Sequence, residues 1–246
     1  MSRNTWLLFS AICLVLLGGL IWTSRGEKID VSSVNQSTIL AADAKSGEIA
    51  DHVYGNKDAK VIIFEYGDYQ CPACKTTVPT LKPVYEKYKD KVAFVFRHFP
   101  LTNIHPNALA AAAVAEAAGK QGKYWQMHDI LYEQQTTWAS LSASNRSSAF
   151  EKYASDLGLD LAKFREDVKS ESVAKKIDFD AALGRKLSVT ETPTIFVNST
   201  KVDHYYKDGK VVDKKTEGAK YALSDPATFE NSVIKPALKS AGVNVE

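Results

Sequence analysis

Cysteine is scarce in this 246-residue chain, which contains only three. Cys71 and Cys74 are separated by two residues, and Cys13 lies in an apolar run near the N-terminus. No cysteine is left for a structural disulfide elsewhere in the folded part. The chain is therefore not a small scaffold held together by disulfides, and the pair at 71 and 74 points to chemistry rather than to structural support.

The chain also lacks an excess of charge of either sign, since 31 lysines and arginines face 29 acids and the formal net charge is +2. The charges are mixed along the chain, as is typical of a solvated surface. We therefore expect no nucleic-acid partner. Internal repeats and low-complexity segments are missing too, apart from the alanines at 110–113, and the apolar fraction of 45% is ordinary for a globular protein.

An apolar run from Trp6 to Trp22 lies near the short limit of a bilayer span. Arg3 favours a cytoplasmic N-terminus, although Arg25 on the other side weakens the charge asymmetry. A cleaved signal peptide is the alternative, but no small-x-small cleavage site follows closely. We therefore expect residues 1–25 to form an uncleaved transmembrane helix, with the remainder outside the cytoplasm, where disulfides are made.

Residues 26–47 are polar and lack a sustained apolar period, which is typical of a flexible tether. The folded domain is then expected at 48–246. Short apolar runs predict core strands at 61–66, 92–99 and 194–198. The long interval between the second and third strands is too helical for a loop, so it predicts an α/β domain with a helical domain inserted at about 103–188.

Periodic apolar patterns predict the helices, and turn residues predict a lysine-rich hairpin at 201–222 around Asp208-Gly209. Pro79 or Pro83 should kink or interrupt the first helix, because proline lacks the backbone N–H. The last helix has Asp225 as its cap and proline at its first position. The expected helices span 71–89, 107–118, 123–135, 150–157, 161–169, 172–187 and 226–241.

The sequence Cys71-Pro72-Ala73-Cys74 falls where the first strand gives way to the first helix. A thiolate at a helix start is stabilised by the free N–H groups and the helix dipole, which lowers the cysteine pKa and makes the sulfur a nucleophile or a good leaving group. A metal site that also uses His98 and His105 is the chief alternative, but this spacing fits no common zinc pattern. We interpret the pair as a redox-active dithiol.

Two distant features accompany the cysteine pair. Strand alternation allows Glu65 to point inward, where a carboxylate is costly unless it is neutral or has a task. The alternative is an ordinary surface acid. Thr192-Pro193-Thr194 directly precedes the third strand, and this proline cannot extend a ladder, so it marks a turn or a special bend.

Together these segments resemble the DsbA-like branch of the thioredoxin superfamily, particularly its membrane-tethered bacterial thiol-disulfide oxidoreductases. The resemblance implies a thioredoxin-like fold with a helical insertion, here preceded by one N-terminal transmembrane helix. This agrees with the element order expected above. The matching segments, in the family's order, are Phe64–Cys74, Arg97–Leu101, His105-Pro106, Gln121–Trp125 and Val189–Thr194.

The resemblance implies a role for each site residue. Cys71 matches the exposed nucleophile and Cys74 its more buried resolving partner, while Glu65 matches the buried acid that relays a proton for Cys74. Two further matches concern substrate: Pro193 corresponds to the cis-proline, and the backbone of Thr192 would face an extended polypeptide. Tyr69 is a candidate floor for a peptide groove.

The implied activity is the introduction of disulfide bonds into reduced secreted or surface proteins, followed by reoxidation by a membrane protein that is usually quinone-linked. No cofactor is expected, because the cysteine pair carries the electrons. We expect a monomer, held in the cell membrane by one span, because the tether is too short for an N-terminal dimerisation domain. A reductase or isomerase is one alternative, because strong oxidases often have histidine at the position of Ala73 and because threonine at the position of Thr192 also occurs in isomerases. A non-catalytic metal- or peptide-binding module is the alternative from another functional class.

Overall fold

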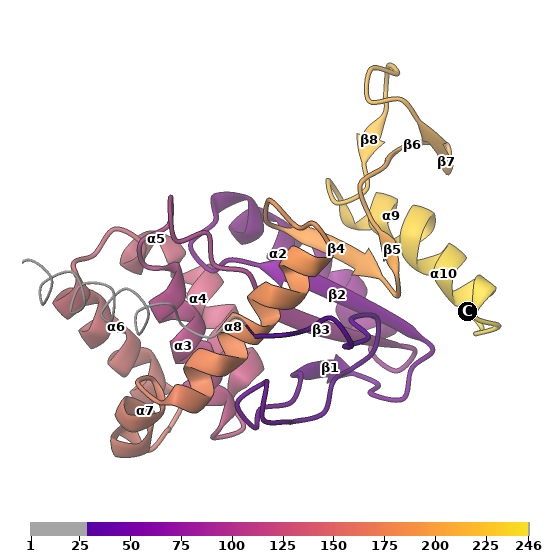
Figure 1. Ribbon diagram of the computed structural model, residues 1–246. Coiled ribbons are helices and arrows are strands. Elements are labelled where there is room, and N and C mark those ends of the chain that lie inside the picture. The colour runs from indigo at the N-terminus through magenta and orange to yellow at the C-terminus, as the bar shows by residue number, and fades with distance from the viewer. Residues whose placement is uncertain (1–28, 246) are drawn as a thin grey trace, which may run out of the picture. The chain divides into compact units, whose positions relative to one another are not determined.

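The computed structural model describes residues 29–245 (Figure 1). The chain divides into two units, Met1–Asp30 and Val31–Glu246, and the description below concerns the second. The transmembrane helix expected at 1–25 lies outside the described residues. Within the described part, no helix has both the length and the apolar character needed to cross a bilayer.

A five-stranded sheet forms the centre of the domain, in the order β1-β3-β2-β4-β5. The parallel pair β2 and β3 lies in the middle, and the other pairings are antiparallel. Both central strands are buried along nearly their whole length, which is why they read as continuous apolar runs. The three expected core strands are confirmed. The strands are β1 (Val53–Gly55), β2 (Val61–Gly67), β3 (Val92–His98), β4 (Thr194–Val197) and β5 (Thr200–Lys201).

The helical insertion between β3 and β4 is also confirmed, and Figure 1 shows its first five helices gathered at one side of the sheet. Its last helix, α8, packs along β3. Helix α2 (Pro72–Tyr88), which precedes the insertion in the chain, lies against the sheet, and the Tyr85 ring stacks on the ring of Phe94 in β3 at 4.1 Å. The inserted helices are α3 (Ala108–Gly119), α4 (Tyr124–Glu133), α5 (Gln135–Trp138), α6 (Ala143–Asp156), α7 (Leu161–Asp167) and α8 (Glu171–Lys186).

Helix α2 is continuous through Pro79 and Pro83, so the expected interruption is wrong. Both prolines lie on the exposed face of the helix. Carbonyl groups that lose their helical partner there are open to water, which keeps the cost of each proline low. The helix thus carries its buried face without a break from the cysteine pair to Tyr88.

The C-terminal helix begins as expected, because Asp225 accepts a hydrogen bond from the Thr228 N–H at 2.9 Å. It comprises α9 (Pro226–Phe229), a π-helical turn η1 (Glu230–Ile234) and α10 (Lys235–Ser240). The wide turn ends two residues before Pro236, which lacks an N–H for the regular α-helical bond.

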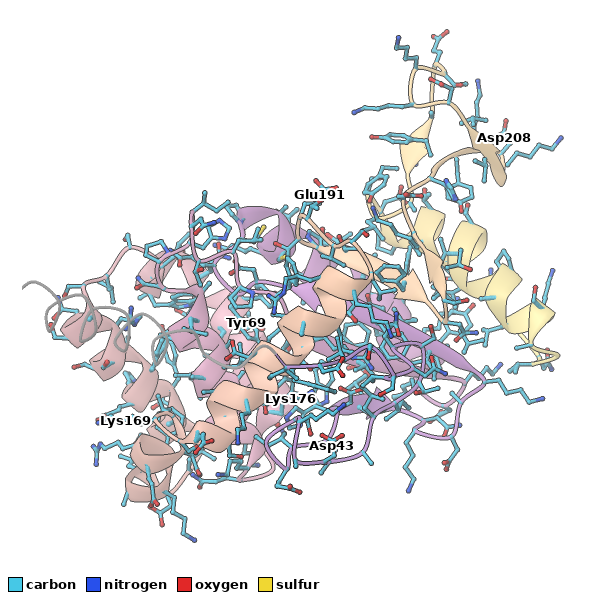
Figure 2. All side chains as sticks on the ribbon, viewed as in Figure 1. Asp43, Tyr69, Lys169, Lys176, Glu191 and Asp208 are labelled. Carbon is cyan, nitrogen blue, oxygen red and sulfur yellow. The ribbon has the colours of Figure 1, made fainter. Side chains whose placement is uncertain are left out.

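The lysine-rich segment forms a second, three-stranded sheet that stands apart from the first in Figure 1. Its turn residues Asp208 and Gly209 have φ of 52° and 75°, as a two-residue hairpin turn requires, and Asp208 lies at the outer end of this sheet (Figure 2). The predicted hairpin is therefore confirmed. Its strands are β6 (Tyr205–Lys207), β7 (Lys210–Val212) and β8 (Lys220–Tyr221).

The segment from residue 31 to 47, expected to be part of a flexible tether, is bonded to the domain. Lys186 Nζ donates to three carbonyls between residues 31 and 34 at 2.8–3.1 Å, and the buried Arg97 donates to the carbonyls of Gln36 and Thr38. The expected boundary at residue 48 is therefore corrected to Val31. The sequence did not predict these contacts, because they are made by backbone carbonyls of a polar segment and not by apolar side chains.

Candidate active site

Cys71 occupies the N-cap position of α2, and Pro72 is the first helical residue. The Cys71 carbonyl accepts the first helical hydrogen bond, from the Lys75 N–H at 3.1 Å. Cys71 is 7% exposed and Cys74, one turn into the helix, is 0% exposed. The structure therefore places both thiols at the helix start, as the sequence predicts, but Cys71 is buried as well as Cys74 and is not the exposed nucleophile that the resemblance implied.

The two thiols have opposite acidities. The hydrogen bond from the Cys74 thiol, together with hydrogen bonds from the N–H groups of Cys74 and Ala73, outweighs burial and lowers the pKa of Cys71 from 9.0 to about 5. Burial, and then the hydrogen bond that its thiol donates to Cys71, raise the pKa of Cys74 well above its usual range. Cys71 is thus the thiolate of the pair and Cys74 the protonated thiol near neutral pH.

The loop before β4 faces Cys71. The Thr192–Pro193 peptide bond is cis, and Thr192 is buried. The Cys71 sulfur lies 3.3 Å from the Thr192 carbonyl oxygen, which accepts a hydrogen bond from Cys71 when the thiol is protonated. The fold therefore brings together three residues that the sequence had singled out, Cys71, Thr192 and Pro193.

Glu65 lies in the middle of β2, paired with Phe96 on one side and Ile195 on the other. It is 0% exposed, and neither carboxyl oxygen has a hydrogen-bond partner. Burial, and then the negative charge on Cys71, raises the pKa of Glu65 from 4.5 to about 8. The alternative of a surface acid is excluded, and the carboxyl carries its proton near neutral pH.

Tyr69 does not form the floor of a groove, and this part of the site prediction is wrong. It is 1% exposed, its ring stacks on Phe96 at 5.1 Å, and Figure 2 shows it inside the molecule. Its hydroxyl lies 3.5 Å from that of Tyr124. The insertion covers this side of the cysteine loop, so a residue two positions before the nucleophile belongs to the core.

Asp68 supports the loop that carries the nucleophile, and the sequence analysis missed it. Its buried carboxylate accepts hydrogen bonds from Gln70 N at 2.7 Å, Leu101 N at 2.8 Å and His105 Nδ1 at 2.7 Å, while its carbonyl accepts from Cys71 N at 3.0 Å. An aspartate just before a helix start is a turn signal that the sequence offers.

Gln135 was also missed, and here no local sequence signal existed. Its Nε2 donates to the carbonyls of Tyr69 and Cys71 at 2.8 and 2.9 Å. The residue lies on α5, 64 positions after Cys71. Only the packing of the insertion brings it to the cysteine loop.

The histidines that a cysteine-containing metal site would require are bonded to carboxylates instead. His98 Nε2 lies 2.8 Å from Glu116 and His105 Nδ1 lies 2.7 Å from Asp68. Within the described residues, one group of ligand atoms lies close enough to hold a metal ion, and it combines His98 and Glu116 with Asp180 rather than with a cysteine. The geometry therefore favours the redox interpretation of the cysteine pair.

Comparison with solved structures identifies the fold. The chain matches BdbD from Bacillus subtilis with a TM-score of 0.60 at 23% identity, over 82% of this chain and 98% of that one. It matches alpha-DsbA1 from Wolbachia pipientis with a TM-score of 0.59 at 24% identity, over 78% and 93% of the two chains. The thiol-disulfide oxidoreductase MdbA from Corynebacterium diphtheriae matches with a TM-score of 0.53 at 19% identity, over 70% and 92%.

Curated relatives carry a different name, and the match to each is partial. A protein named Na(+)/H(+) antiporter NhaA 1 from Salinispora arenicola is 40% identical over 60% of this chain and 22% of its own length. A protein named Na(+)/H(+) antiporter NhaA from Herminiimonas arsenicoxydans is 28% identical over 87% of this chain and 32% of its own. The chain thus spans less than a third of these relatives.

A family model described as thioredoxin matches residues 48–213, which contain the cysteine pair, the insertion and the cis-proline loop. The resemblance to DsbA-like proteins is confirmed by this match together with the structural ones, and they agree with the expected thiol-disulfide oxidoreductase class. This chain belongs to the thioredoxin family and has the fold of DsbA-type proteins.

Proposed function

We propose that the protein introduces disulfide bonds into reduced proteins outside the cytoplasm, through the disulfide and dithiol forms of Cys71 and Cys74. The observation that carries this proposal is the difference between the two thiols. Cys71 has a pKa of about 5 beside the Thr192 carbonyl, whereas Cys74 is buried and holds its proton. A thiolate stable near neutral pH makes the reduced form favourable, which makes the disulfide form an oxidant.

The reaction consists of two exchanges. A substrate thiolate attacks the Cys71 sulfur of the disulfide form, a mixed disulfide forms, and the Cys74 thiolate leaves. Glu65, whose pKa of about 8 keeps it protonated, gives its proton to Cys74. A second substrate thiolate then attacks the substrate sulfur of the mixed disulfide, and Cys71 leaves as a stable thiolate. Two electrons pass from the substrate to the cysteine pair.

The substrate polypeptide binds along the loop that contains Thr192 and Pro193. Thr192 comes just before β4, and its carbonyl is within hydrogen-bond distance of Cys71. An extended chain that pairs with this backbone places its own sulfur at Cys71 without regard to its side chains. This mode suits many reduced secreted or surface proteins.

Residues 1–25 anchor the protein in the cell membrane, with the catalytic domain on the extracytoplasmic side. Each turnover leaves the cysteine pair reduced, so a membrane protein, quinone-linked as is usual in this family, restores the disulfide. The cycle needs no bound cofactor, because the sulfur atoms carry both electrons. The protein acts as a monomer. Its proposed activity follows from the cysteine pair and not from the Na(+)/H(+) antiport in the names of the partial relatives.

A disulfide reductase or isomerase is the second candidate, and Ala73 is the observation that favours it. Ala73 offers only its backbone N–H to the Cys71 thiolate, where a cationic side chain would add to the stabilisation. A less stable thiolate makes the pair a weaker oxidant. The two candidates differ in the direction of electron flow, and therefore in reduction potential.

The deciding experiment is the reduction potential of the Cys71–Cys74 pair, measured by equilibrating the purified protein with glutathione buffers. A value near that of DsbA, about −120 mV, supports an oxidase. A value near that of thioredoxin, about −270 mV, assigns a reductase or isomerase instead.

A further inference from the structure

Two glutamine side chains join the cysteine loop to the helical insertion. Gln135, on α5, is 5% exposed and donates to the carbonyls of Tyr69 and Cys71. Both acceptors are main-chain groups on the two sides of Gln70. One amide group therefore holds the backbone of the loop at the residue that carries the nucleophile.

Gln70 makes the reciprocal connection. Its Nε2 donates to the Ala139 carbonyl at 2.8 Å, and its Oε1 accepts from the Asn107 N–H at 2.6 Å. The loop is thus held by a side chain of the insertion, and the insertion backbone is held by a side chain of the loop. Two opposed pairs of hydrogen bonds fix their relative position more firmly than either glutamine alone.

The Cys71 carbonyl is the acceptor that connects Gln135 to the chemistry. It accepts from Gln135 Nε2 at 2.9 Å and also from the Lys75 N–H at 3.1 Å, which is the first hydrogen bond of α2. The direction of this carbonyl sets how the first turn of the helix begins. The N–H groups of Ala73 and Cys74 in that turn stabilise the Cys71 thiolate.

We propose that Gln135 is a positioning residue for Cys71: by holding the Tyr69 and Cys71 carbonyls, it keeps the N–H groups of the first turn directed at the sulfur. Without it, two buried carbonyls lose a donor, and the loop relaxes toward arrangements in which their negative ends lie nearer the thiolate. The proposal rests on the proposed oxidoreductase function of this site. It makes the insertion a determinant of thiol acidity.

The chain offers a matched control, because Gln134 is the adjacent residue and is exposed. The full-length protein carrying Cys13→Ser is compared with the same protein carrying Gln135→Met, Gln135→Glu or Gln134→Met. The pH dependence of thiolate ultraviolet absorbance reports the pKa of Cys71 in the reduced protein. Thermal unfolding and circular dichroism of each variant report whether it is folded.

Gln135→Met should lower the thiolate fraction about three- to tenfold at pH values below the wild-type pKa. Gln135→Glu should lower it further, because its carboxylate donates no hydrogen bond and adds a negative charge. Gln134→Met should leave the titration unchanged. If Gln135→Met destabilises the protein but titrates like Gln134→Met, the glutamine is only structural and the proposal is overturned.

A failure of the positioning role is distinguishable from a failure of the proposed function. The unsubstituted protein is assayed in parallel for disulfide formation in a reduced unfolded protein. Turnover with an unchanged titration in both Gln135 variants overturns the positioning role alone. A shifted titration without turnover in the unsubstituted protein supports the positioning role and overturns the oxidase function. Should Gln135→Met fail to fold, Gln135→Ala, which removes the amide without adding a charge, supplies the same comparison.

Discussion

The Thr192 carbonyl oxygen lies 3.3 Å from the sulfur of Cys71, although 121 positions separate the two residues in the chain. The contact joins the start of α2 to the loop that precedes β4. It places a main-chain group suited to pairing with an extended polypeptide directly beside the sulfur that reacts. The same sulfur is in contact with Cys74, so the backbone that we propose to bind substrate and both thiols form one site.

Substitution of each cysteine by serine should distinguish the roles of Cys71 and Cys74. Cys71→Ser should abolish disulfide formation, because the sulfur that the substrate thiolate attacks is lost, whereas Cys74→Ser should accumulate mixed disulfides between Cys71 and substrate. Non-reducing electrophoresis with a reduced substrate protein measures both outcomes. Cys13→Ser is the control and should behave as the unsubstituted chain. A Cys74→Ser protein that traps nothing would count against the proposed exchange.

The reactivity of Cys71 should follow its lowered pKa. In the reduced protein, the alkylation rate should be nearly constant from pH 8 down to about pH 6 and should fall steeply through about pH 5, where the thiolate is protonated. The lowered pKa of Cys71 also stabilises the reduced protein. This contribution is present in full above pH 9.0, the pKa of the thiol in the unfolded chain, and it is lost as the pH falls through about 5. Iodoacetamide kinetics over pH 4–8 test the first statement. A midpoint near pH 9 would contradict the site geometry.

Glu65 should make stability depend on pH in the sense opposite to Cys71, and Glu65→Gln should remove this dependence. The folded-state pKa of Glu65 is raised from 4.5 to about 8, so its stabilising contribution is present in full below pH 4.5 and is lost as the pH rises through about 8. A glutamine cannot ionise, and the variant should therefore be more stable than the unsubstituted protein by about 2–4 kcal/mol near pH 9. Denaturant unfolding at pH 5 and pH 9 measures the difference.

The same substitution should slow disulfide exchange modestly, because Cys74 loses its proton donor. Stopped-flow fluorescence with a reduced peptide at neutral pH measures this rate. Unchanged exchange kinetics would remove Glu65 from the mechanism and leave it only as a buried acid.

Asp68→Ala should destabilise the protein by about 2–4 kcal/mol, because the N–H groups of Gln70 and Leu101 lose their acceptor at the cysteine loop. Asp58→Ala, at an exposed position, is the matched control and should change stability by less than about 0.5 kcal/mol. Urea unfolding of the reduced proteins gives both values. Equal effects of the two substitutions would show that the Asp68 contacts contribute little.

Truncation should distinguish the docked segment from a free tether. A chain that begins at residue 48 should be less stable than one that begins at residue 31 by about 3–5 kcal/mol, because the buried Arg97 loses two carbonyl acceptors and Lys186 loses three. Thermal unfolding of the two truncated proteins measures the difference. Equal stability would restore the tether interpretation of residues 31–47.

Local patterns in the sequence were sufficient to predict three core strands, the helical insertion and the position of the cysteine pair. The central strands β2 and β3 are buried on both faces, so their residues are apolar without alternation. Asp225 and the Asp208-Gly209 turn were predictable because a helix cap and a two-residue hairpin depend on a few adjacent residues. Such features need no knowledge of distant contacts.

The sequence by itself thus determined the chemistry of this protein, since two cysteines at a strand–helix junction produce an acidified thiol through the neighbouring Cys74 thiol and local backbone N–H groups. Only the tertiary structure decided that Glu65 and Tyr69 are buried. It also decided that the Thr192 carbonyl lies beside Cys71 and that Gln135 donates hydrogen bonds to the cysteine loop. Burial and hydrogen bonding between residues far apart in the chain depend on how the sheet, the insertion and residues 31–47 pack together. Packing of this kind leaves no periodic pattern in the sequence.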